Sequence, residues 1–139
     1  MRIPVLISVT LAFCPTIVQA QDAAAGEKVF AQCKACHQVG PNAKNAVGPV
    51  LNGLFGRKAG TVEGYNYSPA NKNSGIIWDE GTFAEYIKDP KAKVPGTKMV
   101  YAGLKDEQRI RDLTAYLKQF DATGQKAAAA DGRITVANH

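Results

Sequence analysis

The sequence predicts a small all-α domain of about three to five helices, with glycine-rich loops wrapped around one bulky apolar group. Its 139 residues, 45% of them hydrophobic, fit one globular domain. Apolar residues recur at helical steps early and late in the chain. Between Gly40 and Gly64 lie six glycines with hardly any periodicity, which predicts a long loop. Such a loop has little core of its own, so we expect a bound apolar cofactor to supply one.

The first twenty residues are expected to be a secretory signal peptide, cleaved near Ala20. Arg2 precedes an apolar run over residues 3–18, and small residues follow at the positions that signal peptidase recognises. A membrane anchor is the alternative, but the run contains two prolines and is short for a bilayer of about 30 Å. A lipid-modified Cys14 is a second alternative, which the bulky Phe13 before it disfavours.

We therefore expect a signal peptide over residues 1–20, one domain over residues 21–120 and a flexible, alanine-rich tail over residues 121–139. No later segment is apolar enough to cross a membrane, so a soluble, exported protein without stable membrane insertion is expected. Lys and Arg number 17 against 12 Asp and Glu, a formal net charge of +5. Because the two signs are interleaved, this is not a nucleic-acid-binding pattern, and it favours docking to acidic proteins.

The first predicted helix runs from Ala23 to Gln32, with Asp22 as its N-cap and Val29 and Phe30 on its apolar side. Directly after it comes the pentapeptide Cys33-Lys34-Ala35-Cys36-His37. Two cysteines one helical turn apart can reach two vinyl groups of a porphyrin, while the next histidine binds the iron. The motif therefore predicts one covalently attached haem c.

Two other chemistries use similar residues. A thiol–disulfide oxidoreductase also carries Cys-x-x-Cys, but it needs no following histidine, and no strand-like run precedes Cys33. A structural zinc site needs four ligands. The chain after the signal offers two cysteines and two histidines, one of them His139 at the terminus.

Beyond the glycine-rich loop, residues 71–74 are expected to form a single turn. Asp79 is expected to cap a helix that includes Phe83 and Ile87 and stops before Pro90. The last helix is expected to begin after Asp106, with apolar residues at three- and four-residue steps (Ile110, Leu113, Leu117, Phe120). Its apolar stripe needs a partner, and we expect the first helix to provide it, with Gly26 allowing close approach.

Met99 is the candidate for a second iron ligand, because it is the only methionine after the signal. The alternative is a methionine that fills the core. Its surroundings disfavour that alternative, since Val94-Pro95-Gly96-Thr97-Lys98 forms a polar turn without amphipathic period. A rival class of haem protein, an enzyme or gas carrier with an open iron position, would not use this ligand.

Several ordered blocks of sequence resemble class I cytochromes c. They are Cys33–His37, Val47–Pro49, Leu54–Lys58, Tyr65–Ser68, Ala70–Asn73, Ile77–Trp78, Pro95–Met99 and Asp112–Leu117. The likeness covers Asp22 to about Phe120 and is closest to mitochondrial cytochrome c and bacterial cytochromes c2. It implies the small class I cytochrome c fold, with helices and loops around one haem.

The resemblance implies a role for each site residue. His37 and Met99 would be the axial iron ligands, Cys33 and Cys36 would form the thioether bonds, and the Pro49 carbonyl would accept a hydrogen bond from His37. Further residues are similar to the family's propionate partners (Arg57, Tyr67, Trp78), to its polar network behind the methionine (Asn71, Tyr86, Thr97) and to its aromatic beside the exposed haem edge (Tyr101). Five lysines would surround that edge (Lys34, Lys91, Lys93, Lys98, Lys105).

By the same resemblance, the protein would be a monomeric periplasmic electron carrier and not an enzyme. It would take electrons from a membrane cytochrome bc complex. Its acceptor would be a photosynthetic reaction centre or a terminal oxidase of a respiratory chain, approached through acidic docking surfaces.

Overall fold

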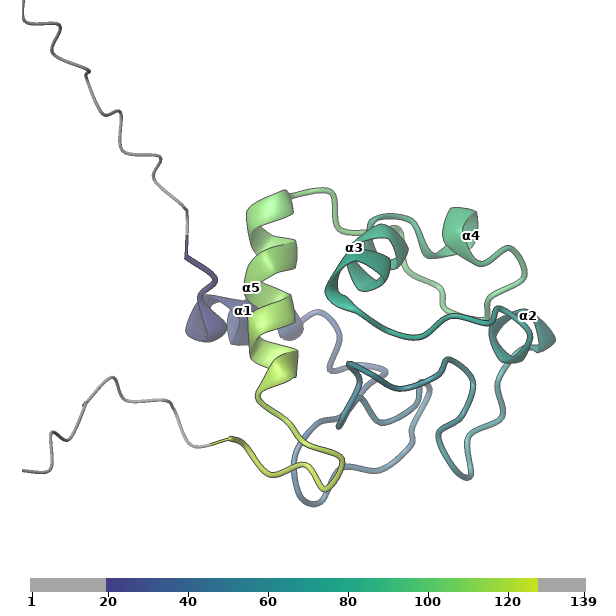
Figure 1. Ribbon diagram of the computed structural model, residues 1–139, viewed down its shortest axis with the longest axis horizontal. Coiled ribbons are helices and arrows are strands. Elements are labelled where there is room, and N and C mark those ends of the chain that lie inside the picture. The colour runs from purple at the N-terminus through teal and green to yellow at the C-terminus, as the bar shows by residue number, and fades with distance from the viewer. Residues whose placement is uncertain (1–19, 128–139) are drawn as a thin grey trace, which may run out of the picture.

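The computed structural model describes residues 20–127, and their regular secondary structure consists of helices joined by long loops (Figure 1). Its elements are α1 (Ala23–Phe30), α2 (Pro69–Lys72), α3 (Glu80–Lys88), α4 (Pro90–Lys93) and α5 (Glu107–Lys118). No strand forms in this part of the chain, which holds only isolated bridges such as Lys58 with Ile77. The predicted all-α fold is confirmed. Nearly all of the expected signal peptide, and residues 128–139 of the expected tail, lie outside the described residues.

Helices α1 and α5 cross with their backbones in close contact, as the sequence predicts. A Cβ placed on Gly26 would lie 1.9 Å from the carbonyl oxygen of Asp112, so only glycine fits at the crossing. The buried Asp112 carboxylate also accepts a hydrogen bond from the backbone N–H of Asp22, at 3.0 Å. That N–H belongs to the N-cap of α1, so the polar pair fixes where α1 begins on α5.

Helix α3 has its predicted bounds, because the Asp79 carboxylate accepts from the Thr82 N–H at 2.7 Å and the helix ends before Pro90. The two short helices differ from expectation. Helix α2 begins at Pro69 rather than residue 71, since Ser68 caps it and proline suits the first turn. Pro90 does not only end α3 but also begins α4, which the sequence analysis did not predict.

The segment between α1 and α2 forms one long loop, which lies on the same side of the molecule as the C-terminal end of the described chain (Figure 1). Together with α3 and α5 it surrounds the core, where Phe30, Leu113 and Leu117 are almost completely buried. Residues 121–127, which the sequence assigns to a flexible tail, turn back onto the domain. There the Ala127 N–H donates to the Gln119 carbonyl at 2.8 Å.

Candidate functional site

A cavity of about 230 Å³ lies between the long loop, α3, α5 and the segment after α4. Folded proteins contain few voids larger than a water molecule, so this space is built to hold a large group. Much of its lining is apolar, including Phe30, Leu54, Phe83, Leu113 and Leu117. All eleven site residues proposed from the sequence line it: Cys33, Cys36, His37, Pro49, Arg57, Tyr67, Asn71, Trp78, Tyr86, Thr97 and Met99.

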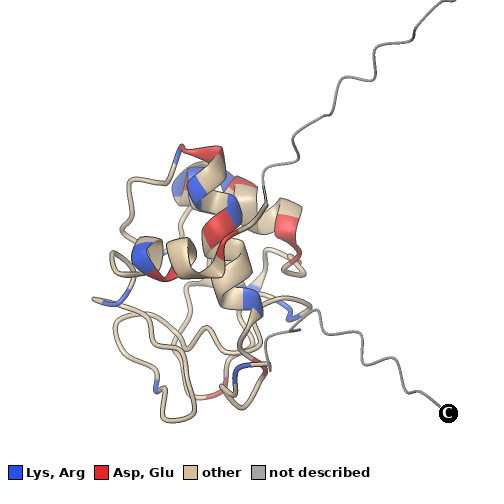
Figure 2. Ribbon diagram, turned by 90° about the vertical axis from the view of Figure 1, so that its left-hand side faces the viewer, with Lys and Arg blue, Asp and Glu red and all other residues tan. Residues whose placement is uncertain are grey.

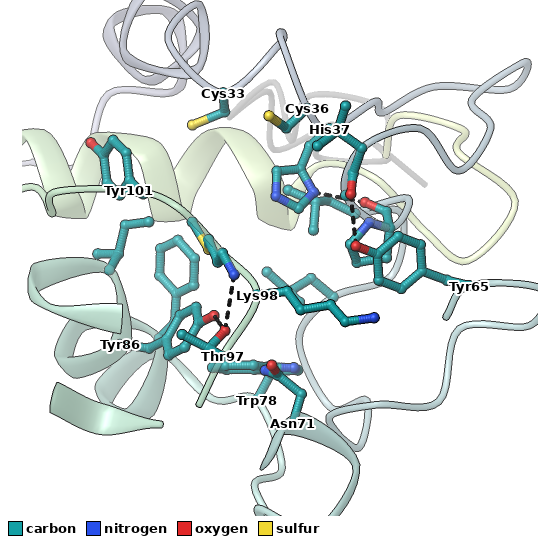
Figure 3. Close-up of a pocket in the computed structure, with 18 of the residues that line it drawn as sticks. Cys33, Cys36, His37, Tyr65, Asn71, Trp78, Tyr86, Thr97, Lys98 and Tyr101 are labelled. Atoms are coloured by element: carbon teal, nitrogen blue, oxygen red, sulfur yellow. Dashed lines mark hydrogen bonds between the residues drawn. The ribbon is translucent and has the colours of Figure 1, made fainter. Parts of the chain in front are cut away.

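One wall of the cavity carries the pentapeptide (Figure 3). A helical turn holds it, in which the His37 N–H donates to the Cys33 carbonyl at 2.9 Å. The His37 Nδ1 lies 2.8 Å from the Pro49 carbonyl oxygen, which can only accept, so Nδ1 carries the proton. Burial lowers the pKa of His37, against the opposing effect of the Pro49 bond. A neutral ring with its Nε2 lone pair available is the form that binds a metal.

Gly48 leaves space for the His37 ring because it has no side chain. A Cβ on this buried residue would lie 2.4 Å from Cε1 and 2.8 Å from Nε2 of the ring. The Gly48 N–H also donates to the Cys36 carbonyl at 2.8 Å. Sequence reasoning assigned this glycine no role, and the block Val47-Gly48-Pro49 was the available signal.

Both thiols of the pentapeptide are free and line the cavity. Burial, with the neighbouring Cys36 as a smaller cause, raises the pKa of Cys33 to about 11. Its thiol is therefore protonated at neutral pH. A thiol–disulfide oxidoreductase needs a thiolate of lowered pKa, so this environment disfavours that alternative.

The opposite wall carries a pair of hydroxyl groups next to Met99. The Tyr86 hydroxyl lies 3.1 Å from Thr97 Oγ1, and Thr97 Oγ1 accepts from the Met99 N–H at 3.2 Å. Asn71, which the resemblance groups with them, bonds elsewhere: its Oδ1 accepts from the Ser68 hydroxyl at 2.8 Å. Asn71 is thus part of the α2 cap, although its side chain lines the same cavity (Figure 3).

Arg57, Tyr67 and Trp78 all line the cavity, and the Trp78 backbone N–H donates to the Arg57 carbonyl at 2.9 Å. The Arg57 guanidinium donates from Nη1 to the Asn52 carbonyl at 2.7 Å and from Nη2 to the Val50 carbonyl at 3.2 Å. Among residues 20–127 no carboxylate pairs with it. A half-buried cation without a counter-charge favours an anionic group on the ligand.

These features fit a haem. The cavity is large and apolar, a neutral imidazole and a thioether line it, two thiols lie beside the imidazole, and a cation with two further N–H or O–H groups can receive carboxylates. No cluster of three or more His, Cys, Asp or Glu that could hold a bare metal ion occurs in the described part of the chain. No helix there is long and apolar enough to cross a membrane.

The five lysines proposed for docking differ in their contacts. Lys98 lines the cavity and Lys34 is exposed beside Cys33. Lys93 forms an ion pair with Glu85, and Lys105 donates to a backbone carbonyl. Lys91 is exposed on α4, and the predicted edge aromatic, Tyr101, lines the cavity.

Comparisons with known proteins agree with this site. The family model described as "Cytochrome c" matches residues 23–121. The chain is 69% identical over 107 residues to cytochrome c2 of Blastochloris viridis, covering 77% of this chain and 84% of that protein. It is 61% identical over 107 residues to cytochrome c-550 of Nitrobacter winogradskyi, covering 77% and 98%. The structure of cytochrome cH from Methylobacterium extorquens matches with a TM-score of 0.67 and 52% identity, covering 70% and 98%.

Proposed function

Because the chain belongs to the cytochrome c family, whose members are electron carriers, we propose that it is a periplasmic one-electron shuttle with His37 and Met99 as its iron ligands. The observation that carries this proposal is the cavity itself, which has the imidazole on one wall and the methionine loop on the other. Bound there, a haem supplies reversible one-electron oxidation and reduction of its iron.

The chain's own residues would hold that group on both sides. Cys33 and Cys36 would bind it covalently, while the Pro49 carbonyl keeps the Nδ1 proton on His37 and increases the donor strength of Nε2. Thr97, bonded to both Tyr86 and the Met99 backbone, would hold the methionine loop against the cavity. Arg57, Tyr67 and Trp78 would donate to the propionates, and Asn71 would shape the wall from α2.

The ligand assignment is tested with the purified holoprotein. We expect the haem to resist extraction by acidified organic solvent, and the reduced parent protein not to bind carbon monoxide at neutral pH. Met99→Ala should bind carbon monoxide readily, because it opens one iron position. A colourless parent protein, or extractable haem, would contradict covalent attachment, and carbon monoxide binding by the parent would contradict Met99 as ligand.

The partners are proposed from the charge and from the relatives. Without Arg2 of the proposed signal peptide the formal net charge is +4, and this charge and the exposed lysines near the cavity suit transient docking to acidic surfaces. The donor would be a membrane cytochrome bc complex, and the acceptor a photosynthetic reaction centre or a terminal oxidase. A monomer, with a signal peptide over residues 1–20 and its domain over residues 21–120, completes the proposal.

Membranes that contain either acceptor alone would distinguish the two. Reduced holoprotein should be oxidised by the true acceptor at a rate that falls as salt rises, because salt screens the attraction between exposed charges. A rate that rises with salt would contradict docking through lysines. Oxidation by neither membrane would contradict the proposed partners.

A further inference from the structure

Residues 121–127, which we name the strap, form an ordered turn at the C-terminal end of the described chain. The Asp121 carboxylate builds the turn by accepting from the Thr123 N–H at 2.8 Å and the Gln125 N–H at 3.0 Å. Lys126 lies over the rings of Tyr116 and Phe120, 5.6 and 5.4 Å from their centroids. The family match ends at residue 121, so nearly all of the strap lies beyond it.

The strap packs tightly against the long loop (Figure 1). A Cβ on the buried Gly124 would lie 2.0 Å from the Gly40 carbonyl oxygen and 2.6 Å from Asn52 Nδ2. Next to this contact, the Gly53 N–H donates to the Phe120 carbonyl at 3.1 Å, and a Cβ on Gly53 would lie 2.9 Å from the Cα of Ala122. The strap backbone therefore lies in close van der Waals contact with the loop at Gly124 and Ala122, directly after the hydrogen bond that Phe120 makes to the loop.

The loop residues that the strap contacts are bonded in turn to the His37 side of the cavity. The Asn52 side chain bonds both backbone groups of Gly40, with its Oδ1 accepting and its Nδ2 donating at 2.8 Å each. The Leu51 N–H donates to the Gln38 carbonyl at 3.0 Å. These bonds tie residues 38–40, which follow His37, to residues 50–52, which follow Pro49.

We propose that the strap positions His37. It holds Gly40, Asn52 and Gly53 in place, so that the Pro49 carbonyl remains hydrogen-bonded to the Nδ1–H of the His37 ring. The same loop segment also holds Arg57, because the Arg57 Nη1 donates to the Asn52 carbonyl. The inference rests on the proposed function, since a fixed ring matters for an iron ligand. Loosening the strap should therefore loosen the bond between His37 and Pro49 before the rest of the domain unfolds.

Three variants of the full-length holoprotein test this. Gly124→Ala adds a methyl group where the Gly40 carbonyl lies, and the exposed change Asp121→Ala removes the acceptor of the turn without adding atoms. Gly75→Ala is the matched control. Its φ of 70° resembles the 81° of Gly124, but nothing lies within 4 Å of its Cβ position, so it has the backbone strain without the contact.

The measurement is hydrogen–deuterium exchange of the His37 Nδ1 proton in the reduced holoprotein by NMR, with the Leu113 amide of α5 as reporter of global unfolding. Gly124→Ala and Asp121→Ala should speed exchange at His37 by about tenfold or more relative to Leu113, and Gly75→Ala should not. If Gly124→Ala fails to fold, the exchange rate of Asp121→Ala alone tests the role of the strap. Unchanged exchange at His37, or an equal change in the control, would overturn the strap's role. Failure of the parent to carry haem would instead overturn the proposed function.

Discussion

At Gly48 a methyl group would occupy the place of the His37 ring, 2.4 Å from its Cε1 atom. The φ angle of Gly48 is not in the left-handed region, so the requirement for glycine here is steric. We expect Gly48→Ala to displace the ring and to destabilise the holoprotein by about 1–3 kcal/mol. The loss should appear in urea unfolding followed at the haem absorbance.

The nearby change Ala46→Ser is the control for Gly48→Ala. Ala46 is exposed and does not line the cavity, so adding a hydroxyl there should change stability by no more than about 0.5 kcal/mol. Equal stability of Gly48→Ala and the parent would contradict the steric argument.

The sequence proposes those site residues whose chemistry is local or unique, and the structure brings them to one cavity. Cys33, Cys36 and His37 are adjacent, and Met99 is the only methionine after the signal. Gly48 was not identified from the sequence, because the atoms that leave no room for a Cβ at this position belong to His37, eleven residues earlier in the chain. The resemblance grouped Asn71 with Tyr86, whereas the Ser68 hydroxyl three residues away bonds it instead.

At the level of elements, two helical glycines separate the effect of close helix packing on stability from the effect of helix propensity. Gly26 of α1 is in contact with the backbone of α5, while Gly81 of α3 has only the Asp79 carboxylate near its Cβ position, at 3.4 Å. Gly26→Ala should destabilise by about 3 kcal/mol or more, because neither backbone can yield. Gly81→Ala should stabilise by about 0.5 kcal/mol, since alanine favours helix. Thermal unfolding of both variants measures the contrast, and a stabilised Gly26→Ala would contradict the observed crossing.

Helix α3 also gives a prediction for pH. The Thr82 N–H donates to the Asp79 carboxylate and is the main reason why the pKa of Asp79 lies below its ordinary value. A carboxyl with a lowered folded pKa stabilises fully above its unfolded pKa, and the effect is lost as pH falls through the folded pKa. Asp79→Asn keeps an N-cap acceptor without the charge.

Between about pH 6 and about pH 3, the parent should therefore lose more free energy of unfolding than Asp79→Asn. Urea unfolding of both proteins at a series of pH values measures this difference. Parallel pH profiles would show that the Asp79 charge contributes nothing to α3.

Length and capping explain which helices the sequence could predict. Helices α1, α3 and α5 have 8, 9 and 12 residues, enough to show an apolar period, and each has an aspartate cap. Helices α2 and α4 have four residues each, too few for a period. A proline can stand after the end of one helix or at the start of the next, and Pro90 does both, because the Asp89 carboxylate caps α4 by accepting from the Ala92 N–H.

For the whole molecule, we expect charge beside the cavity to govern electron transfer more than net charge does. Lysines and arginines lie among aspartates and glutamates along the longer helices α1, α3 and α5 (Figure 2), whereas the charged residues of α2 and α4 are all lysines. Lys98 lines the cavity without an acidic partner among the described residues, whereas Lys118 is paired with Glu80. The two lysines therefore allow the same change of charge at two different places.

We expect Lys98→Gln to slow oxidation of the reduced holoprotein by the anion hexacyanoferrate(III) about twofold to fivefold at low salt. The same variant should speed oxidation by a cationic cobalt(III) complex, because the lost charge repels cations. Both effects should disappear near 1 M salt, where the Debye length is about 3 Å. Stopped-flow rates for Lys118→Gln should match the parent with both oxidants, since Lys118 does not line the cavity and the same change of charge there acts away from the site of electron transfer. If the two variants slow the anion equally, net charge rather than the cavity mouth governs electron transfer.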